Sequence, residues 1–194
     1  MRWDYRSSDF YSDLLIVALV AALLLCFHQL LTSPVRKALV RRAERAHRQA
    51  PPLEPGTAID DVWSVRSLDG KGTLALSSLR GHVLFVNFWA TWCAPCRREF
   101  PSIEKLYRRY KDKDVLFLCL SQEDPKFLRL YLRKHPLGLP VYTIMQPPYT
   151  WNVSALPSTF IISKAGKVAL SRTGAARWDQ TGTTDLLDSL LTKP

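Results

Sequence analysis

Two cysteines, Cys93 and Cys96, stand in the run TWCAPCRREF and have two residues between them. A pair at this spacing can bind a metal ion, lock a fold as a structural disulfide, or exchange electrons as a dithiol–disulfide couple. The spacing alone does not distinguish these three chemistries. The residues around the pair have to decide between them.

A zinc site needs more ligands than this pair supplies. Structural zinc takes a full tetrahedral set, usually from two paired clusters. The other cysteines are Cys26, inside a long apolar run, and Cys119, in the apolar stretch VLFLCL, and the four histidines are scattered along the chain. We therefore expect no metal site, and we interpret Cys119 as a small core residue.

Redox chemistry fits the surroundings of the pair better. Cys93 follows the apolar run 83–88, which predicts a buried strand, and precedes a helical pattern over 94–110. At the start of a helix, unpaired N–H groups and the helix dipole favour a thiolate, and the two arginines after Cys96 add positive charge. We predict that Cys93 is the attacking thiolate and that Cys96, on the same helical face, resolves the mixed disulfide.

Strand and helix signals alternate through the C-terminal three quarters of the chain. Apolar runs indicate strands, amphipathic patterns indicate helices, and DGKG indicates a hairpin turn. We expect strands over 83–88, 115–120, 159–162 and 168–171, helices over 94–110, 125–135 and 183–191, and a hairpin around 69–72. This alternation is typical of an α/β sheet covered on both faces.

The run VNFWATWCAPC, followed by LPSTFII and a Gly-Lys hairpin, resembles the thioredoxin superfamily. Within it, the chain is most similar to membrane-anchored bacterial thiol-disulfide oxidoreductases of the TlpA/ResA type, over about residues 55–192. The resemblance implies a thioredoxin-like fold, a central mixed sheet with helices on both faces, and a central insertion over 136–153. It also implies no cofactor beyond a redox-active disulfide between Cys93 and Cys96.

The resemblance extends the site to a distant proline, Pro157, in the run ALPST. By itself, a proline that opens a strand is more often preceded by a trans peptide bond. The resemblance implies a cis bond that faces the cysteines, with backbone groups of Leu156 pairing to an extended substrate segment. Trp92 and Pro95 complete the predicted substrate-binding residues.

Two further polar residues separate this chain from thioredoxin itself. Asn87, six residues before Cys93, stands where thioredoxin has a buried aspartate, and an amide cannot accept a proton. Glu99 lies one turn beyond Cys96, where it either interacts with the helix dipole or, as the resemblance implies, tunes the thiols. We count Glu99 as a candidate catalytic residue. We expect Trp178, in the run GAARWD, to pack in the core.

An apolar run from Leu14 to Phe27 precedes the domain. Residues 10–31 would span roughly 33 Å as a helix, which predicts a transmembrane anchor, and a cleaved signal peptide is the alternative. The predicted organisation is an N-terminal tail over 1–13, the transmembrane anchor over 10–31, a basic juxtamembrane segment and Pro-rich linker over 32–56, and a thioredoxin-like domain over 57–194.

The net charge of +10 is unevenly spread, and the densest basic segment lies directly beside the apolar run, where residues 32–50 carry six basic residues and one Glu. This position favours lipid headgroups as the partner, so we predict a lipid bilayer and no nucleic acid. The same basic residues favour a cytoplasmic domain, whereas the resemblance implies the opposite side. We predict a single-pass protein of the bacterial inner membrane with an extracytoplasmic redox domain.

The predicted function is reduction of protein disulfides, with a membrane electron-transfer thiol-disulfide partner that regenerates the dithiol. The resemblance suggests apocytochrome c as substrate, in cytochrome c maturation. An oxidase or isomerase of the same fold is the first alternative, because the residues between the cysteines do not set the direction. A copper-delivery protein is a weaker one, since such proteins usually have C-x-x-x-C and a distant His, and His135 lacks a ligand context.

Overall fold

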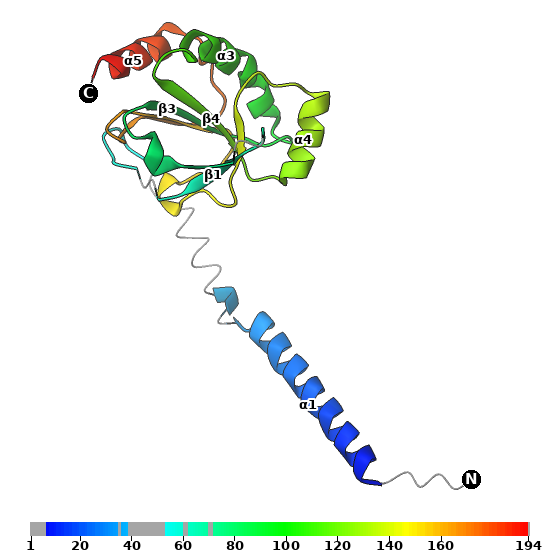
Figure 1. The fold of residues 1–194 in the computed structure, drawn as a ribbon. Helices are drawn as coiled ribbons and strands as arrows, with labels where there is room; N and C mark the ends of the chain where they lie inside the picture. The colour runs from blue at the N-terminus through cyan, green and yellow to red at the C-terminus, as the bar shows by residue number, and fades with distance from the viewer. Residues whose placement is uncertain (1–6, 35, 39–52, 60–61, 70–71, 194) are drawn as a thin grey trace. The chain divides into compact units, whose positions relative to one another are not determined.

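The computed structural model divides the chain into two compact units, residues 1–49 and residues 50–194. Figure 1 shows the chain with the described residues in colour. These described residues are 7–34, 36–38, 53–59, 62–69 and 72–193. The predicted juxtamembrane segment and linker fall mostly on 39–52, outside the described residues.

The N-terminal unit contains one long helix, α1 (Ser7–Thr32). Its large apolar side chains between Leu14 and Phe27 each expose half or more of their surface. Among the described residues of the chain, no helix is both long and apolar enough to cross a membrane. Side chains of α1 are described only for 14–29, so the predicted anchor over 10–31 lies partly outside them and stays a prediction.

The C-terminal unit is built on one mixed sheet of seven strands, as the resemblance implied. Its order is β2-β1-β5-β4-β3-β6-β7, in which β3 and β5 run parallel to β4 and the other pairs are antiparallel. The strands are β1 (Ser64–Ser67), β2 (Thr73–Ala75), β3 (Val83–Phe88), β4 (Val115–Ser121), β5 (Val141–Thr143), β6 (Ser158–Ile162) and β7 (Val168–Thr173).

Strand β3 is buried along its whole length, which its near-continuous apolar run predicted. It pairs with β4 on one side and with β6 on the other, so both of its edges are hydrogen-bonded. In this register, Phe88 at the end of β3 lies opposite Ser158 at the start of β6. The end of β3, from which the chain continues to Cys93, therefore lies beside the start of β6 and the segment that precedes it.

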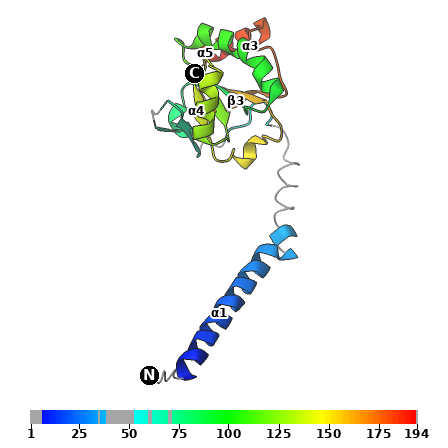
Figure 2. The same cartoon turned by 90° about the vertical axis from the view of Figure 1, so that its right-hand side faces the viewer.

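The domain has three α-helices in its described part: α3 (Ala94–Tyr110), α4 (Pro125–Lys134) and α5 (Thr181–Thr192). All three contribute to the same core cluster, which they share with Phe85 of β3 and Phe117 of β4. Figure 1 and Figure 2 label the three helices along the ribbon. The α-helices thus cover one face of the sheet. The prediction of helices on both faces was wrong in one respect, because none of the three α-helices lies on the second face.

Two short 3-10 helices, η1 (Leu76–Leu79) and η2 (Tyr149–Trp151), contribute to the opposite face. Leu76 and Leu79 lie in the second core cluster because residues three apart share a side of a 3-10 helix. The connection from β2 to β3 spans only residues 76–82, which leaves no room for an α-helix of ordinary length. The short β2–β3 connection therefore accounts for a 3-10 helix, and not an α-helix, at η1.

The predicted central insertion over 136–153 contains a strand that sequence patterns did not indicate. This strand, β5, has only three residues, and it pairs parallel to β4 and antiparallel to β1. Its segment therefore completes the sheet. The predicted hairpin around 69–72 is confirmed, since β1 and β2 pair antiparallel with Arg66 opposite Thr73.

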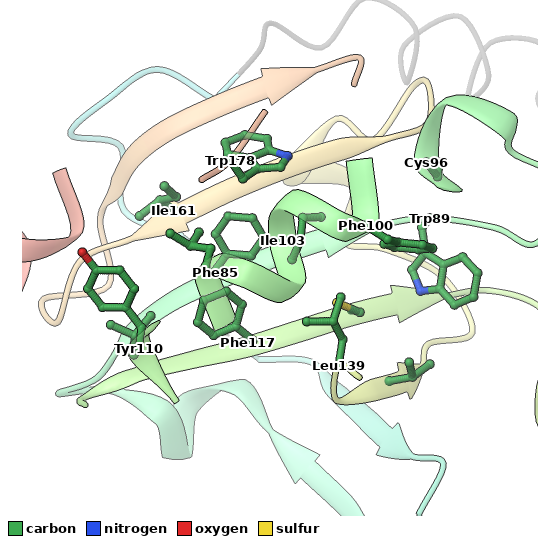
Figure 3. Close-up of a cluster of buried hydrophobic side chains, with 14 of the residues drawn as sticks. Phe85, Trp89, Cys96, Phe100, Ile103, Tyr110, Phe117, Leu139, Ile161 and Trp178 are labelled. Carbon is green, nitrogen blue, oxygen red and sulfur yellow. The ribbon is translucent and has the colours of Figure 1, made fainter. Parts of the chain in front are cut away.

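An aromatic core lies between α3 and the sheet (Figure 3). Phe85 stacks on Phe117 with ring centroids 5.0 Å apart, and the indole of Trp178 meets Phe85 edge to face at 5.3 Å. Nearer the cysteines, Trp89 and Phe100 form another edge-to-face pair at 5.0 Å. Because α3 is packed from its first turn to its last, the cysteines at its start have a defined place on the sheet.

Tyr110, at the end of α3, joins this helix to α5 through its hydroxyl group. Its buried hydroxyl lies 3.1 Å from the Thr184 carbonyl oxygen and 2.9 Å from Asp188 Oδ1, and can donate to either. Burial, together with the Asp188 carboxylate, raises the pKa of Tyr110 to about 12, so the donor keeps its proton at neutral pH.

Tyr110→Phe should lower the free energy of unfolding by about 1 kcal/mol, because it removes this hydrogen bond between α3 and α5. Urea unfolding followed by circular dichroism measures the change. Tyr107→Phe on the same helix is the matched control, and it should change stability less. Equal effects of the two substitutions would show that the Tyr110 hydroxyl does not join α3 to α5.

Candidate active site

Cys93 and Cys96 form a disulfide at the N-terminus of α3, with their Cα atoms 5.3 Å apart. Cys93 is the N-cap residue, and its Sγ accepts a hydrogen bond from the backbone N–H of Cys96 at 3.2 Å. In the reduced protein, an amide in this position stabilises a thiolate on Cys93. Cys96 is completely buried, and 4% of Cys93 is exposed. This geometry favours Cys93 as the group that meets a substrate.

The predicted substrate-binding residues next to the pair differ in exposure. Trp92 exposes 72% of its surface, the most of any tryptophan among the described residues, although it is directly bonded to buried Cys93. Pro95 is half-buried in the first turn of α3, where a missing N–H costs no helical hydrogen bond. An exposed indole beside the disulfide offers an apolar surface to a bound polypeptide.

The Leu156–Pro157 peptide bond is cis, as the resemblance implied. Pro157 is buried and Leu156 is half-buried, with Leu156 packing against both core clusters. Pro157 immediately precedes Ser158, which lies opposite Phe88 at the end of β3. The proline and the chain leading to Cys93 therefore meet at the same edge of the sheet.

Glu99 lies on the buried side of α3, with 2% of its surface exposed. Its Oε1 accepts a hydrogen bond from Asn87 Nδ2 at 2.8 Å. Its Oε2 accepts from Trp178 Nε1 at 3.0 Å and from the Ala176 backbone N–H at 3.1 Å. This carboxyl group links α3 to β3 and to the loop before α5. Its place is therefore not that of an exposed first-turn charge.

Burial is the main influence on this carboxyl group, and it raises the pKa of Glu99 above the ordinary value of 4.5. The hydrogen bonds from Trp178, Asn87 and Ala176 act in the opposite direction, because they stabilise the carboxylate. The Asn87 amide also donates to Thr159 Oγ1 at 2.8 Å, so β3, β6 and α3 share one polar network. Sequence reasoning found Glu99 and Asn87 and placed Trp178 in the core. It missed the Trp178 hydrogen bond, which no local pattern indicates.

The two remaining cysteines, Cys119 and Cys26, are free thiols outside the Cys93–Cys96 disulfide. Cys119 is buried on β4, opposite Asn87 in the β3–β4 register, and burial strongly raises the pKa of its thiol. A thiol that stays protonated and enclosed is a core residue, as predicted. Cys26 is exposed on α1, in the other unit. The redox-active arrangement among the described residues is thus the Cys93–Cys96 pair.

A cysteine pair at the start of a helix that follows a buried strand of a mixed sheet, with a cis-proline at the same edge of that sheet, defines a thioredoxin-like dithiol site. The chain belongs to the AhpC/TSA family, whose family model matches residues 57–171. The matched range contains the cysteine pair, Glu99 and the cis-proline.

The chain is similar to bacterial proteins named thiol-disulfide oxidoreductase ResA, which confirms the ResA-type resemblance. It is 37% identical over 109 residues to one from Bacillus cereus, a match that covers 54% of this chain and 61% of the relative. It is 36% identical over 121 residues to that of Geobacillus thermodenitrificans, covering 61% of this chain and 68% of the relative. The match to the Bacillus cereus protein thus spans about three fifths of that relative's length.

Solved structures share the fold. A Chlorobium tepidum protein assigned as thiol:disulfide interchange protein DsbE superposes with a TM-score of 0.63 and 26% identity, covering 72% of this chain and 99% of that chain. The exposed lipoprotein thioredoxin Etrx1 of Streptococcus pneumoniae gives a TM-score of 0.55 at 23% identity, covering 66% of this chain and 98% of that chain. These likenesses confirm the thioredoxin-like α/β fold.

Glu99→Gln tests the buried carboxyl group through the pH dependence of stability. Because the pKa of Glu99 is raised on folding, the native protein holds a proton that the unfolded chain releases above about pH 4.5. Stability from the protonated form is complete below that pH and is lost as the pH rises through the native pKa. The variant should lack this decline when urea unfolding is measured across a pH series. The same decline in both proteins would contradict the assignment.

Proposed function

We propose that the protein is a thiol-disulfide oxidoreductase that reduces disulfides in protein substrates. The observation that carries this proposal is the N-cap position of Cys93, whose sulfur faces the Cys96 amide at the start of α3. A sulfur held there is a stabilised thiolate when reduced, and the thiolate is the nucleophile of disulfide exchange. The curated relatives named thiol-disulfide oxidoreductase support the same activity.

In the reaction, the Cys93 thiolate attacks one sulfur of the substrate disulfide and releases the other substrate sulfur as a thiolate. A mixed disulfide now joins Cys93 to the substrate. Cys96, three residues along on the same helix, then loses its proton and attacks the Cys93 sulfur. The Cys93–Cys96 disulfide forms and the second substrate thiolate leaves. Two electrons have passed from the protein to the substrate.

The buried carboxyl group supplies proton chemistry near the pair. Glu99 lies one turn after Cys96 on the buried side of α3, where burial raises its pKa above the ordinary value. A buried carboxyl group with a raised pKa is a candidate for proton exchange with the thiols. We assign to Glu99 the tuning of thiol protonation. Asn87 does not fill this role, because its amide group is not acidic.

The surface around the site fits an extended polypeptide as substrate. Trp92 offers a broad apolar face beside the disulfide, and Leu156 precedes the cis-proline at the same edge of the sheet. Backbone pairing at Leu156 and apolar contact at Trp92 hold a segment that carries the target cysteine. A membrane electron-transfer thiol-disulfide partner regenerates the dithiol, and apocytochrome c, in cytochrome c maturation, is the substrate that the family resemblance suggests.

The proposed location is the bacterial inner membrane, with residues 10–31 as a single-pass anchor and the redox domain on the extracytoplasmic side. The apolar residues from Leu14 to Phe27 support an anchor, because apolar side chains exposed in this number favour a lipid environment. The ResA-type resemblance supports the extracytoplasmic side, where disulfides persist and a dedicated reductant is needed.

Cys93→Ser should abolish disulfide reduction, because it removes the nucleophile, and Cys96→Ser should trap the mixed disulfide with substrate. Insulin reduction by the full chain, with non-reducing gels of the trapped species, measures both effects. Cys119→Ala is the matched control and should keep the activity. Iodoacetamide at mildly acidic pH should label Cys93 first, and faster labelling of Cys96 would reverse the two roles.

Fusion of alkaline phosphatase after residue 194 tests the location of the domain. Alkaline phosphatase is active only after export, so the extracytoplasmic assignment predicts an active fusion. The basic residues of 32–50 predict the opposite result. A silent phosphatase fusion beside a fluorescent green fluorescent protein fusion would place the domain in the cytoplasm.

A further inference from the structure

The loop that enters α3 is tied to two other parts of the domain through Thr91, a buried residue two positions before Cys93. The Thr91 backbone N–H donates to Glu123 Oε2 at 2.7 Å, and its hydroxyl donates to Glu123 Oε1 at 2.6 Å. The Thr91 carbonyl oxygen accepts from Arg97 Nη1 at 2.5 Å. The amide, hydroxyl and carbonyl groups of Thr91 therefore all have defined partners. We call Thr91, Glu123 and Arg97 together the Thr91 clamp.

Glu123 is itself held in place at the end of β4. Its Oε2 also accepts from the Ser121 hydroxyl at 3.1 Å, and its own N–H donates to that hydroxyl at 3.2 Å. The parallel pair β3–β4 continues beyond the strand, since the Trp89 N–H donates to the Leu120 carbonyl at 3.0 Å. The ends of two parallel strands thus lie side by side, and Glu123 fastens the cysteine loop to the second of them.

We propose that Glu123 is a positioning residue for the attacking sulfur: by holding Thr91, it keeps Cys93 at the N-cap of α3. This inference rests on the role proposed for Cys93. The link is short, because only Trp92 separates the two residues and the Cys93 N–H donates to the Ala90 carbonyl at 3.1 Å within the same turn. Without Glu123, two Thr91 donors lose their acceptor and the turn is free to shift. The Cys96 amide then no longer faces the Cys93 sulfur.

If Glu123 acted only through its negative charge, its substitution would change the reactivity of Cys93 in the opposite direction from loss of the clamp. The charged groups around this end of the domain come from four elements. They are Arg97, Arg98 and Glu99 on α3, Glu123 after β4, Asp124 at the N-cap of α4, and Arg172 on β7. A carboxylate disfavours a nearby thiolate, so removing its charge alone makes Cys93 more reactive at low pH. Loss of the clamp makes Cys93 less reactive, because the thiolate loses its amide donor. The sign of the change separates the two roles.

The test is the pH profile of iodoacetamide alkylation of the reduced full chain, with the labelled cysteine identified by mass spectrometry. Glu123→Gln should slow alkylation of Cys93 at mildly acidic pH by about two- to tenfold, the effect of one lost hydrogen bond, and should shift the profile to higher pH. Thr91→Val should do the same. The double variant should be no slower than either single one, since both remove the same contact.

Two control variants keep the test interpretable. Asp124→Asn removes the same charge one residue further on, at the N-cap of α4, and should leave the profile unchanged. Thr91→Ser retains the hydroxyl and should behave as the unchanged protein. Faster alkylation in Glu123→Gln, an unchanged profile, or additive effects with Thr91→Val would overturn the proposal. Labelling of Cys96 in the unchanged protein would refute the proposed role of Cys93 instead.

Discussion

The pairing of β3 with its two neighbours is the constraint on which the site depends. Antiparallel pairing with β6 puts Phe88 opposite Ser158, which brings the cis-proline to the end of the strand that leads to Cys93. Parallel pairing with β4 brings Glu123 to the same edge. A one-residue slip of either pair would turn buried side chains to the opposite face. The strand pairing that buries β3 therefore also brings the residues of the site together.

A polar network inside the apolar core also holds α3 in place at this edge of the sheet. Burying the Glu99 carboxyl group is unfavourable unless donors meet its oxygens, and the donors come from Asn87 on β3 and from Ala176 and Trp178 in the loop before α5. Since the helix that carries Glu99 also carries both cysteines, the network fixes the rotation of α3 against the sheet. Stability and redox chemistry thus share the same contacts.

Patterns local in sequence predicted the strand before the cysteines and the helix α3, because periodicity and helix-start signals involve neighbouring residues. The cis-proline came from the family resemblance. The contacts of Glu99 with Trp178 and of Thr91 with Glu123 join residues 79 and 32 positions apart, so no local pattern contains them. The three-residue strand β5 was too short to recognise. Among the described residues, the opposite face carries only the 3-10 helices η1 and η2, and the pattern of strands and helices in the sequence did not indicate either of them.

The central claim is that Cys93 and Cys96 form a reversible two-electron redox couple. A redox titration of the full chain against a glutathione buffer, with thiols trapped by alkylation and mapped by mass spectrometry, tests it most directly. We expect a single two-electron transition in which these two cysteines change state together, while Cys26 and Cys119 stay as thiols throughout. A pair that does not titrate, or a disulfide that involves Cys119, would contradict it.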